Sequence, residues 1–224
     1  DLAQAIPDFE GMNLLGYDAM AVGNHEFDNE LSVLFNQQKL AKFPFLSANV
    51  YNVKTMTRVF QSHMKKTLGP FSVAIVGFTT AETPGGSMKF PYGKLEVRSP
   101  IAEAADLIPR LRRSFDFVIA VTHMGHYKDG EHGASAPGDV TLARSVPGID
   151  LIVGGHSQNA IYEPVVENGT IVVQAEDYGK YVGRIDLELD KVSFKLISYK
   201  LIPVNFFSRY QNSEKLLDDP ECIG

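Results

Sequence analysis

The sequence predicts an α/β fold in which two sheets pack face to face with helices outside, a four-layer sandwich. Two observations carry this prediction. Helix-like and strand-like segments alternate over most of the chain, whereas from Gly169 onward apolar strand-like runs follow one another with no helix between them. The first pattern is typical of α/β units, and the second indicates an antiparallel sheet. At 224 residues, 44% of them hydrophobic, the chain can bury a core of this kind.

The first elements are predicted from apolar spacing and from residues that end helices. Residues 1–16 are expected to be loop and helix, and the buried face of that helix is expected to hold Phe9, Met12, Leu14 and Leu15. A short strand at 18–22 is followed by a helix over about 29–41, with Asp28 at its N-cap position and Pro44 after its end. Residues 45–50 then form the next strand.

The middle elements follow from the same signals. Residues 58–70 are expected to form an exposed excursion or a hairpin before the strongly apolar strand 71–78. The stretch 83–92 contains Pro84 followed by two adjacent glycines, which predicts a loop. An amphipathic helix over 101–113 follows, and Pro109 is expected to kink or divide it.

The remaining strands are β-branched runs bounded by polar turns. Two buried strands each lead into a polar loop, and a final group of consecutive strands is expected to form the antiparallel sheet. The two buried strands are 117–121 and 151–153, and the final group is 171–175, 183–189 and 192–202.

Composition excludes several functional classes. Lys and Arg number 21 against 27 Asp and Glu, a net charge of −6, which argues against a nucleic-acid surface. No apolar run is long enough to span a membrane. Cys222 is the single cysteine, so neither an internal disulfide nor a cysteine-based zinc site is expected.

Three polar clusters follow predicted strands and are the most informative feature of the chain. The first is Asn24-His25-Glu26-Phe27, the second runs from Thr122 to His126, and the third runs from Gly154 to Gln158. A histidine at one strand end is usually structural, but three such ends with polar neighbours are hard to explain by packing. They indicate a metal-dependent hydrolase site.

In the first cluster, Asn24 can offer an amide oxygen to a cation while His25 points into the same cavity. Asp28 lies three residues after His25, a spacing that places the two side chains next to each other on a helical turn. A carboxylate beside an imidazole fixes which ring nitrogen carries the proton. The pair His25 and Asp28 is therefore a candidate general acid for a departing alkoxide.

The other two clusters supply candidate metal ligands. His123 follows the strand at 117–121, and His156 follows the strand at 151–153 through two glycines that allow a tight turn. His156 and Gln158 are two residues apart and reach one cavity if the loop is extended. Imidazole nitrogen with amide oxygen suits Zn²⁺, Mn²⁺ or Co²⁺ better than Ca²⁺. His126 and His132 are weaker candidates in a polar loop over the site, and His126 is a candidate for contacting phosphate.

These motifs, in this order and spacing, resemble the 5′-nucleotidase branch of the calcineurin-like metallophosphoesterases. Within that branch the likeness is greatest to the bacterial periplasmic type that hydrolyses UDP-sugars and 5′-nucleotides. Two segments show this resemblance most strongly, Gly16 to Asp28 and Gly179 to Arg184. The resemblance extends from residue 1 to about Asn205, and the last 19 residues match nothing familiar.

The resemblance implies a role for each matching residue. Asn24, His123, His156 and Gln158 would bind two divalent ions (Zn, Mn, Co or Mg), and His25 with Asp28 would form the catalytic pair. The substrate would be a nucleotide or nucleotide sugar, and the protein would be a monomer in the periplasm or a secreted one. A signal peptide would lie ahead of Asp1.

Two departures from the family pattern, the missing N-terminal motifs and the missing C-terminal substrate domain, limit what this chain is expected to do. The family's Asp-x-His and Gly-Asp motifs would precede Asp1, and no Asp-x-His occurs in the chain. Residues 1–205 are therefore expected to be a partial catalytic domain, incomplete at its N-terminus, and residues 206–224 a tail or the start of a linker to a C-terminal substrate domain. A partial ligand set should bind metal weakly, so this chain alone is expected to be inactive or weakly active.

Two alternatives stay open. The same fold could act on 2′,3′-cyclic nucleotides, a choice that the C-terminal domain would decide. The chain could also be a degenerate, non-enzymatic metallophosphoesterase domain that binds a partner. The presence of all six candidate site residues speaks against this second alternative.

Overall fold

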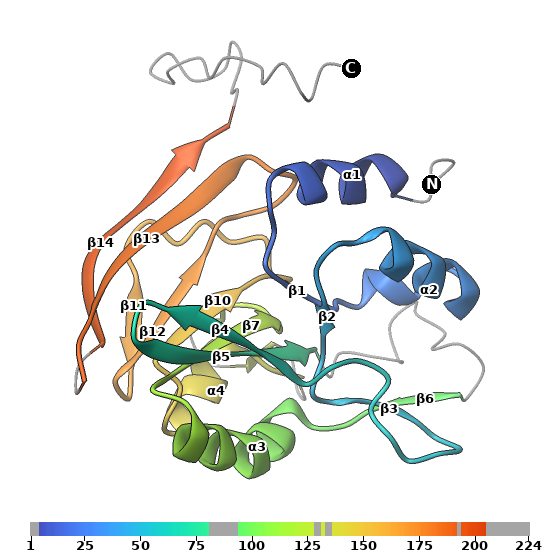
Figure 1. Cartoon of the computed structure of the whole chain (residues 1–224), viewed down its shortest axis with the longest axis horizontal. Coiled ribbons are helices and arrows are strands. Elements are labelled where there is room, and N and C mark those ends of the chain that lie inside the picture. Colours follow the sequence, from blue (N-terminus) through green and yellow to red (C-terminus); the bar gives the residue numbers. More distant parts are fainter. Residues whose placement is uncertain (1–4, 81–93, 128–130, 133–135, 192–193, 205–224) are drawn as a thin grey trace.

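A mixed six-stranded sheet forms the centre of the protein (Figure 1). The computed structural model describes residues 5–80, 94–127, 131–132, 136–191 and 194–204. The strands lie in the order β11-β12-β10-β7-β5-β4. Their bounds are β4 (His63–Leu68), β5 (Phe71–Thr79), β7 (Phe117–His123), β10 (Leu151–Gly154), β11 (Val165–Glu167) and β12 (Thr170–Gln174). The four inner strands are parallel, and β4 and β11 close the two edges as antiparallel strands.

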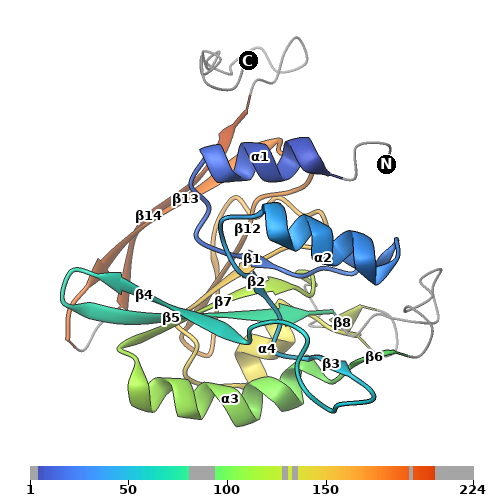
Figure 2. The same cartoon turned by 45° about the vertical axis from the view of Figure 1, so that its right-hand side comes forward.

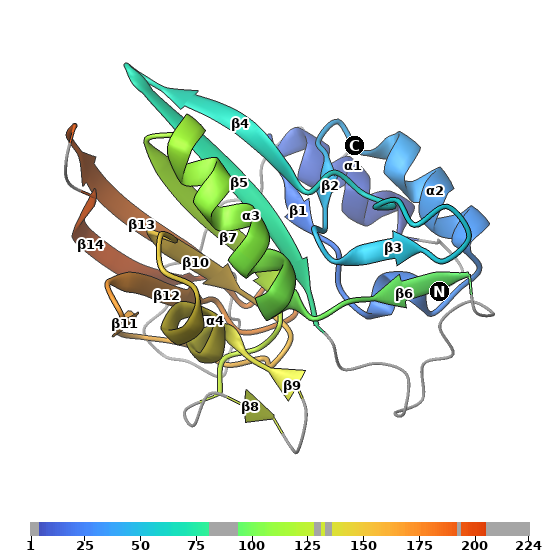
Figure 3. The same cartoon turned by 90° about the horizontal axis from the view of Figure 1, so that it is seen from below.

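Two helices cover one face of this sheet, α3 (Pro100–Ser114) and α4 (Asp139–Ser145) (Figure 3). Alternate residues of the inner strands point toward them, among them Val118 and Ala120 of β7 and Ile152 of β10, all fully buried. Pro109 lies inside α3 without dividing it, because the helix runs unbroken through that residue. The expected division at Pro109 was therefore wrong.

The opposite face is covered by a long antiparallel hairpin, β13 (Tyr181–Leu189) and β14 (Phe194–Pro203). Leu151, Ile171 and Val173 of the central sheet pack against apolar side chains of this hairpin. Helices, sheet and hairpin thus lie in successive layers, as Figure 2 shows. The antiparallel pairing of the last two strands is confirmed. The expected placement of 171–175 with them is wrong, since β12 lies parallel to β10.

Short elements from the N-terminal part of the chain, with one later strand, form a second apolar cluster. It contains α1 (Ile6–Leu14), β1 (Met20–Ala21), the 3₁₀ helix η1 (His25–Phe27), α2 (Leu31–Leu40), β2 (Phe45–Leu46), β3 (Val50–Asn52) and β6 (Leu95–Val97). β1 pairs in parallel with β2, and β3 is antiparallel to β6. Phe9, Phe27, Leu34 and Phe45 meet in the cluster. A further small pair is β8 (Glu131–His132) with β9 (Ala136–Pro137).

The α/β class is confirmed. A hairpin within 58–70 does not form: this segment contains one strand, β4, which pairs instead with the following strand β5. Leu14 and Leu15, expected to be buried, are 55% and 73% exposed, because α1 ends there and the chain turns at Gly16. Asp28 follows η1, and the N-cap of α2 is Glu30, so Asp28 does not cap that helix.

The loop expected at 83–92 lies outside the described residues, as do residues 205–224. No helix in the described part of the chain is both long and apolar enough to span a membrane.

Candidate metal centre

The candidate site lies where parallel strands of the central sheet end. β7 ends at His123 and β10 ends at Gly154, two residues before His156. The two strands are neighbours, with Val121 opposite Val153. Carboxyl ends of adjacent parallel strands meet at one edge, where open α/β sheets form their sites. The topology therefore brings the second and third polar clusters together.

The first cluster reaches the same edge from the N-terminal third of the chain. The side-chain oxygen Oδ1 of Asn24 lies 2.8 Å from Nε2 of His123. The rings of His123 and His156 have their centroids 4.9 Å apart. Three of the four predicted ligands, Asn24, His123 and His156, thus lie within one small region.

The ring of His123 packs against a glycine. A Cβ atom added to Gly23 would lie 2.9 Å from ring atoms of His123, so the ring occupies the space that a side chain at position 23 would need. A Cβ atom added to Gly155 would lie 3.6 Å from Nδ1 of the same ring, an ordinary van der Waals distance. Burial, with help from the neighbouring His156 and His25, lowers the pKa of His123 to about 4. The imidazole is consequently neutral at pH 7, the form in which a histidine binds metal.

The third cluster has a constrained backbone. His156 has φ 81° and Gln158 has φ 57°, conformations that residues other than glycine rarely adopt. Such backbone outliers gather at functional sites, where the surrounding structure holds them. The Gln158 side chain is exposed, and the described contacts do not join it to Asn24 or His123. The structure thus places Gln158 on the same loop as His156 without bringing it into the cluster.

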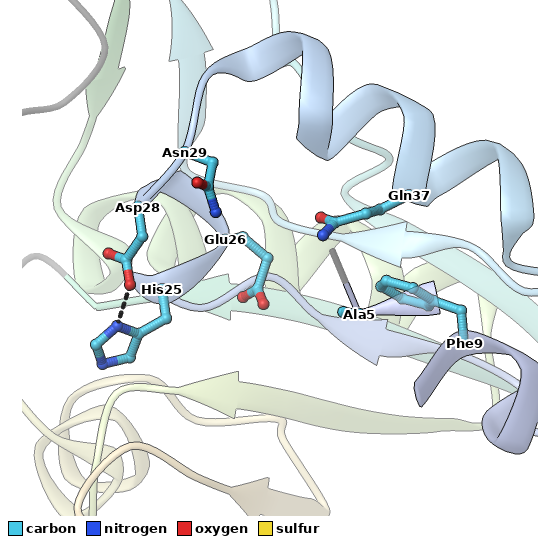
Figure 4. A pocket seen from close by; sticks show the side chains of 7 residues that line it. All are labelled: Ala5, Phe9, His25, Glu26, Asp28, Asn29 and Gln37. Carbon is cyan, nitrogen blue, oxygen red and sulfur yellow. Dashed lines mark hydrogen bonds and ion pairs between the residues drawn. The ribbon is translucent and has the colours of Figure 1, made fainter. Parts of the chain in front are cut away.

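His25 and Asp28 form a pair at the rim of the site. Nδ1 of His25 lies 2.7 Å from Oδ2 of Asp28, and the two side chains are 73% and 46% exposed (Figure 4). The pair lies across the turn of η1, which buried Phe27 anchors in the core. Glu26 accepts a hydrogen bond from the backbone N–H of Gly23 at 2.5 Å and so closes the same turn. Burial raises the pKa of Glu26.

A pocket of about 390 Å³ adjoins this pair on the side of α1 and α2. Figure 4 shows His25 and Asp28 at one end of it and residues of α1 and α2 at the other. Its lining comprises Ala5, Phe9, His25, Glu26, Asp28, Asn29 and Gln37. The pocket combines one aromatic ring with several polar groups.

The donors at this edge suit a borderline divalent cation. Two imidazoles and an amide oxygen are the ligand types of zinc and its neighbours in the first transition series. The 2.8 Å separation of Asn24 Oδ1 and His123 Nε2 is short enough for one cation to touch both atoms at about 2.0–2.2 Å. Within the described ranges, no group of three or more His, Cys, Asp or Glu side chains is placed to hold a metal.

Of the two weaker candidates, the structure describes a contact for His126. The backbone N–H of His126 donates to Ser157 Oγ at 2.8 Å, and burial lowers the pKa of the His126 ring. His126 thus links the second and third clusters through its main chain. His132 belongs to β8, and its side chain falls outside the described part.

Sequence reasoning missed two buried polar residues beneath the site. Asp139 is fully buried at the start of α4, and Gln174 is 2% exposed at the end of β12. Gln174 hydrogen-bonds Ser157, the residue between His156 and Gln158. The signal available for Gln174 was a polar residue closing the apolar run 171–173. Asp139 follows a glycine in a polar segment and gave no comparable signal.

Comparison with known families identifies the fold. The profile of the calcineurin-like phosphoesterases matches residues 6–159, which include all six predicted site residues. The chain belongs to this family. Members of it use divalent metal ions.

Three relatives illustrate the match to this phosphoesterase family. The chain is 45% identical to protein UshA of Yersinia enterocolitica over 235 residues, 96% of this chain and 43% of that protein. It is also 45% identical to a 5′-nucleotidase of Vibrio cholerae, over 92% of this chain and 41% of that protein. Among solved structures, a putative 5′-nucleotidase from Staphylococcus aureus is similar, with a TM-score of 0.74 and 25% identity over 95% of this chain and 42% of that one. The chain spans less than half the length of these relatives.

Proposed function

We propose that the protein is a metal-dependent phosphohydrolase of the 5′-nucleotidase and UDP-sugar hydrolase type, which releases phosphate from nucleoside monophosphates. The observation that carries the proposal is the His25–Asp28 pair at 2.7 Å beside the contact between Asn24 and His123. This arrangement combines a proton donor with a set of metal ligands at one edge of the sheet. Relatives named 5′-nucleotidase support the substrate class.

Four residues would hold the metal: Asn24, His123, His156 and Gln158. The neutral ring of His123 and the amide of Asn24 are donors without charge, so further charge neutralisation would come from the substrate phosphate and from other ligands. We propose two divalent ions, with Zn, Mn, Co or Mg as candidates. When bound, such ions polarise the phosphate and lower the pKa of a water molecule.

His25 would protonate the leaving oxygen of the nucleoside. Asp28 engages Nδ1 of the ring, so the proton to be donated is on Nε2, the other nitrogen. The exposure of His25 suits this role, because the ring must reach a substrate that enters from solvent. Asp28 also holds the ring in place between turnovers.

The remaining parts of the proposal concern the whole protein. Residues 1–205 would act as its phosphoesterase domain, and residues 206–224 as a tail or a linker. A nucleotide or nucleotide sugar would be the substrate, and the protein would act as a periplasmic or secreted monomer.

Phosphate release from 5′-AMP with added Mn²⁺ or Co²⁺ tests the proposal, using the protein at its full natural length. We expect His25→Ala to lower turnover by about 10²–10⁴-fold, the usual effect of losing a positioned general acid. Metal content should stay unchanged. His63→Ala, in β4 outside the site, is the matched histidine control and should retain activity. Release that is equal in the wild type and His25→Ala, or absent with every metal, would overturn the proposal.

A further inference from the structure

A carboxyl group that the proposed chemistry does not use lies beneath the site. Asp139 is 0% exposed, at the first position of α4. Its Oδ1 accepts a hydrogen bond from Thr122 Oγ1 at 2.5 Å. Its Oδ2 is buried and has no hydrogen-bond partner among the described residues. A buried carboxyl with one unpaired oxygen is costly, so packing alone does not account for it.

The contacts of Asp139 bracket His123. The side chain is bonded to Thr122, directly before His123, and the backbone N–H donates to Gly125 O at 2.8 Å, two residues after it. One residue of α4 therefore holds the chain on both sides of the histidine. The end of β7 cannot shift relative to α4 without breaking one of these bonds.

The free oxygen of the same carboxyl faces the strand that leads to His156. A Cβ atom added to Gly154 would lie 2.2 Å from Asp139 Oδ2 and 3.3 Å from Oε1 of Gln174. The carboxyl group thus occupies the space left by the missing side chain of Gly154. It lies between the end of β7 and the end of β10, the two strands that carry His123 and His156.

We propose that Asp139 is a positioning residue for the metal centre, which sets the separation of the His123 and His156 loops through Thr122, Gly125 and Gly154. The inference deepens the proposed function and rests on it for the identity of the bound group. Asp139 touches neither histidine, so it acts only through the strand ends. Burial raises the pKa of this carboxyl, and the Thr122 hydrogen bond lowers it.

Two measurements on four variants of the full-length protein test this role. Mn²⁺ affinity is measured by titration calorimetry, and backbone hydrogen exchange of residues 122–126 and 154–159 is measured without metal. Asp139→Ala removes the carboxyl, and Asp139→Asn keeps its shape and an oxygen for Thr122. Thr122→Val removes the hydroxyl with little change of volume. Leu142→Ala is the matched control, because it opens a cavity in the same helix and leaves the Thr122, Gly125 and Gly154 contacts of Asp139 in place.

We expect Asp139→Ala to weaken Mn²⁺ binding by about 10–100-fold, the usual effect of losing a group that orients metal ligands. Exchange should rise in both segments. Thr122→Val should change both measurements in the same direction, and Asp139→Asn should restore them toward wild type. Leu142→Ala should lower the unfolding temperature and leave Mn²⁺ affinity unchanged.

Two results would overturn the inference. One is unchanged exchange in either segment of Asp139→Ala, and the other is an equal loss of Mn²⁺ affinity in Leu142→Ala. If Asp139→Ala does not fold, Thr122→Val decides, and normal Mn²⁺ affinity with normal exchange in that variant counts against the role. If the proposed function is wrong, the wild type binds no Mn²⁺ or releases no phosphate. The hydrogen exchange of residues 122–126 and 154–159 then still shows whether Asp139 holds these two segments in place.

Discussion

The ring of His123 makes the central contacts of the site. It lies 2.8 Å from Asn24 at its Nε2 atom, against Gly23 on one face and near His156. We predict that His123→Ala lowers metal affinity by at least about 10-fold. Metal content after dialysis against limiting Mn²⁺ is the measurement. Full metal content in the variant would remove His123 from the ligand set.

A second prediction at the residue scale concerns Asp139 and pH. Burial raises the pKa of this carboxyl from 3.8 to about 7 in the folded protein. Between pH 3.8 and about pH 7, the folded protein therefore keeps a proton on Asp139 that the unfolded chain has lost. The protonated Asp139 contributes its full stabilisation below pH 3.8. This stabilisation is lost as pH rises through about 7, and the free energy of unfolding falls by at most about 4 kcal/mol.

Asp139→Asn should remove this dependence, because its amide does not titrate. Urea unfolding of the metal-free protein at pH 5 and pH 8 measures the change. We expect the variant to gain stability relative to wild type at the higher pH. An equal fall of the free energy of unfolding in both proteins would contradict the raised pKa.

Close packing of short elements fixes the second apolar cluster onto the main sheet. A Cβ atom on Gly77 of β5 would lie 2.3 Å from the backbone oxygen of Leu46 in β2. Backbone atoms cannot move aside as a flexible side chain can, so Gly77→Ala should destabilise the protein by about 1–3 kcal/mol or more.

Gly11→Ala is the matched control, because Gly11 lies in α1 with no atom within 4 Å of an added Cβ. It should stabilise the protein by about 0.5–1 kcal/mol through helix propensity. Urea unfolding of both variants checks the two signs. The packing argument fails if Gly77→Ala unfolds at the same urea concentration as wild type.

Elements with a strong pattern of their own were predictable from the sequence. The strands at 71–78 and 117–121 and the helix at 101–113 occur close to the expected residues, since apolar periodicity defines them locally. The partner of a strand is not encoded in its own pattern. β12 therefore was assigned to the final antiparallel group, whereas it extends the parallel sheet beside β10. The predicted burial of Leu14 and Leu15 was wrong for a similar reason, because burial depends on which elements pack next to a residue.

At the scale of the whole molecule, the hairpin β13–β14 closes one face of the central sheet. Phe194 of β14 lies 5.4 Å from Phe117 of β7, measured between ring centroids, and packs in the cluster of Leu151 and Ile171. Phe194→Ala should destabilise the protein by about 2–4 kcal/mol, less than for a fully buried ring. Thermal unfolding measures it. A loss of less than about 0.5 kcal/mol would mean that the hairpin does not contribute to the core through this ring.

The location of the site was predictable from the sequence, but the buried polar residues beneath it were not. Polar clusters after strands are local signals, and the parallel pairing of β7 with β10 then places His123 and His156 together. Asn24 follows β1, which pairs with β2 in a separate sheet, so its approach to His123 depends on the tertiary structure. The groups below them come from α4 and β12, and only the tertiary structure shows that Asp139 faces Gly154. The exposed position of Gln158 was likewise not readable from its two-residue spacing to His156. The roles assigned to all six site residues stay predictions.

The contact between Asn24 and His123 has a consequence for folding. Its two partners are 99 residues apart in the chain, and Asp139 must be in place as well to hold the second of them. Contacts of such high sequence separation form late and slow the search for the native state. The candidate ligands Asn24 and His123 therefore stay apart until the chain between them has folded. A cation that is captured earlier would meet single histidines only.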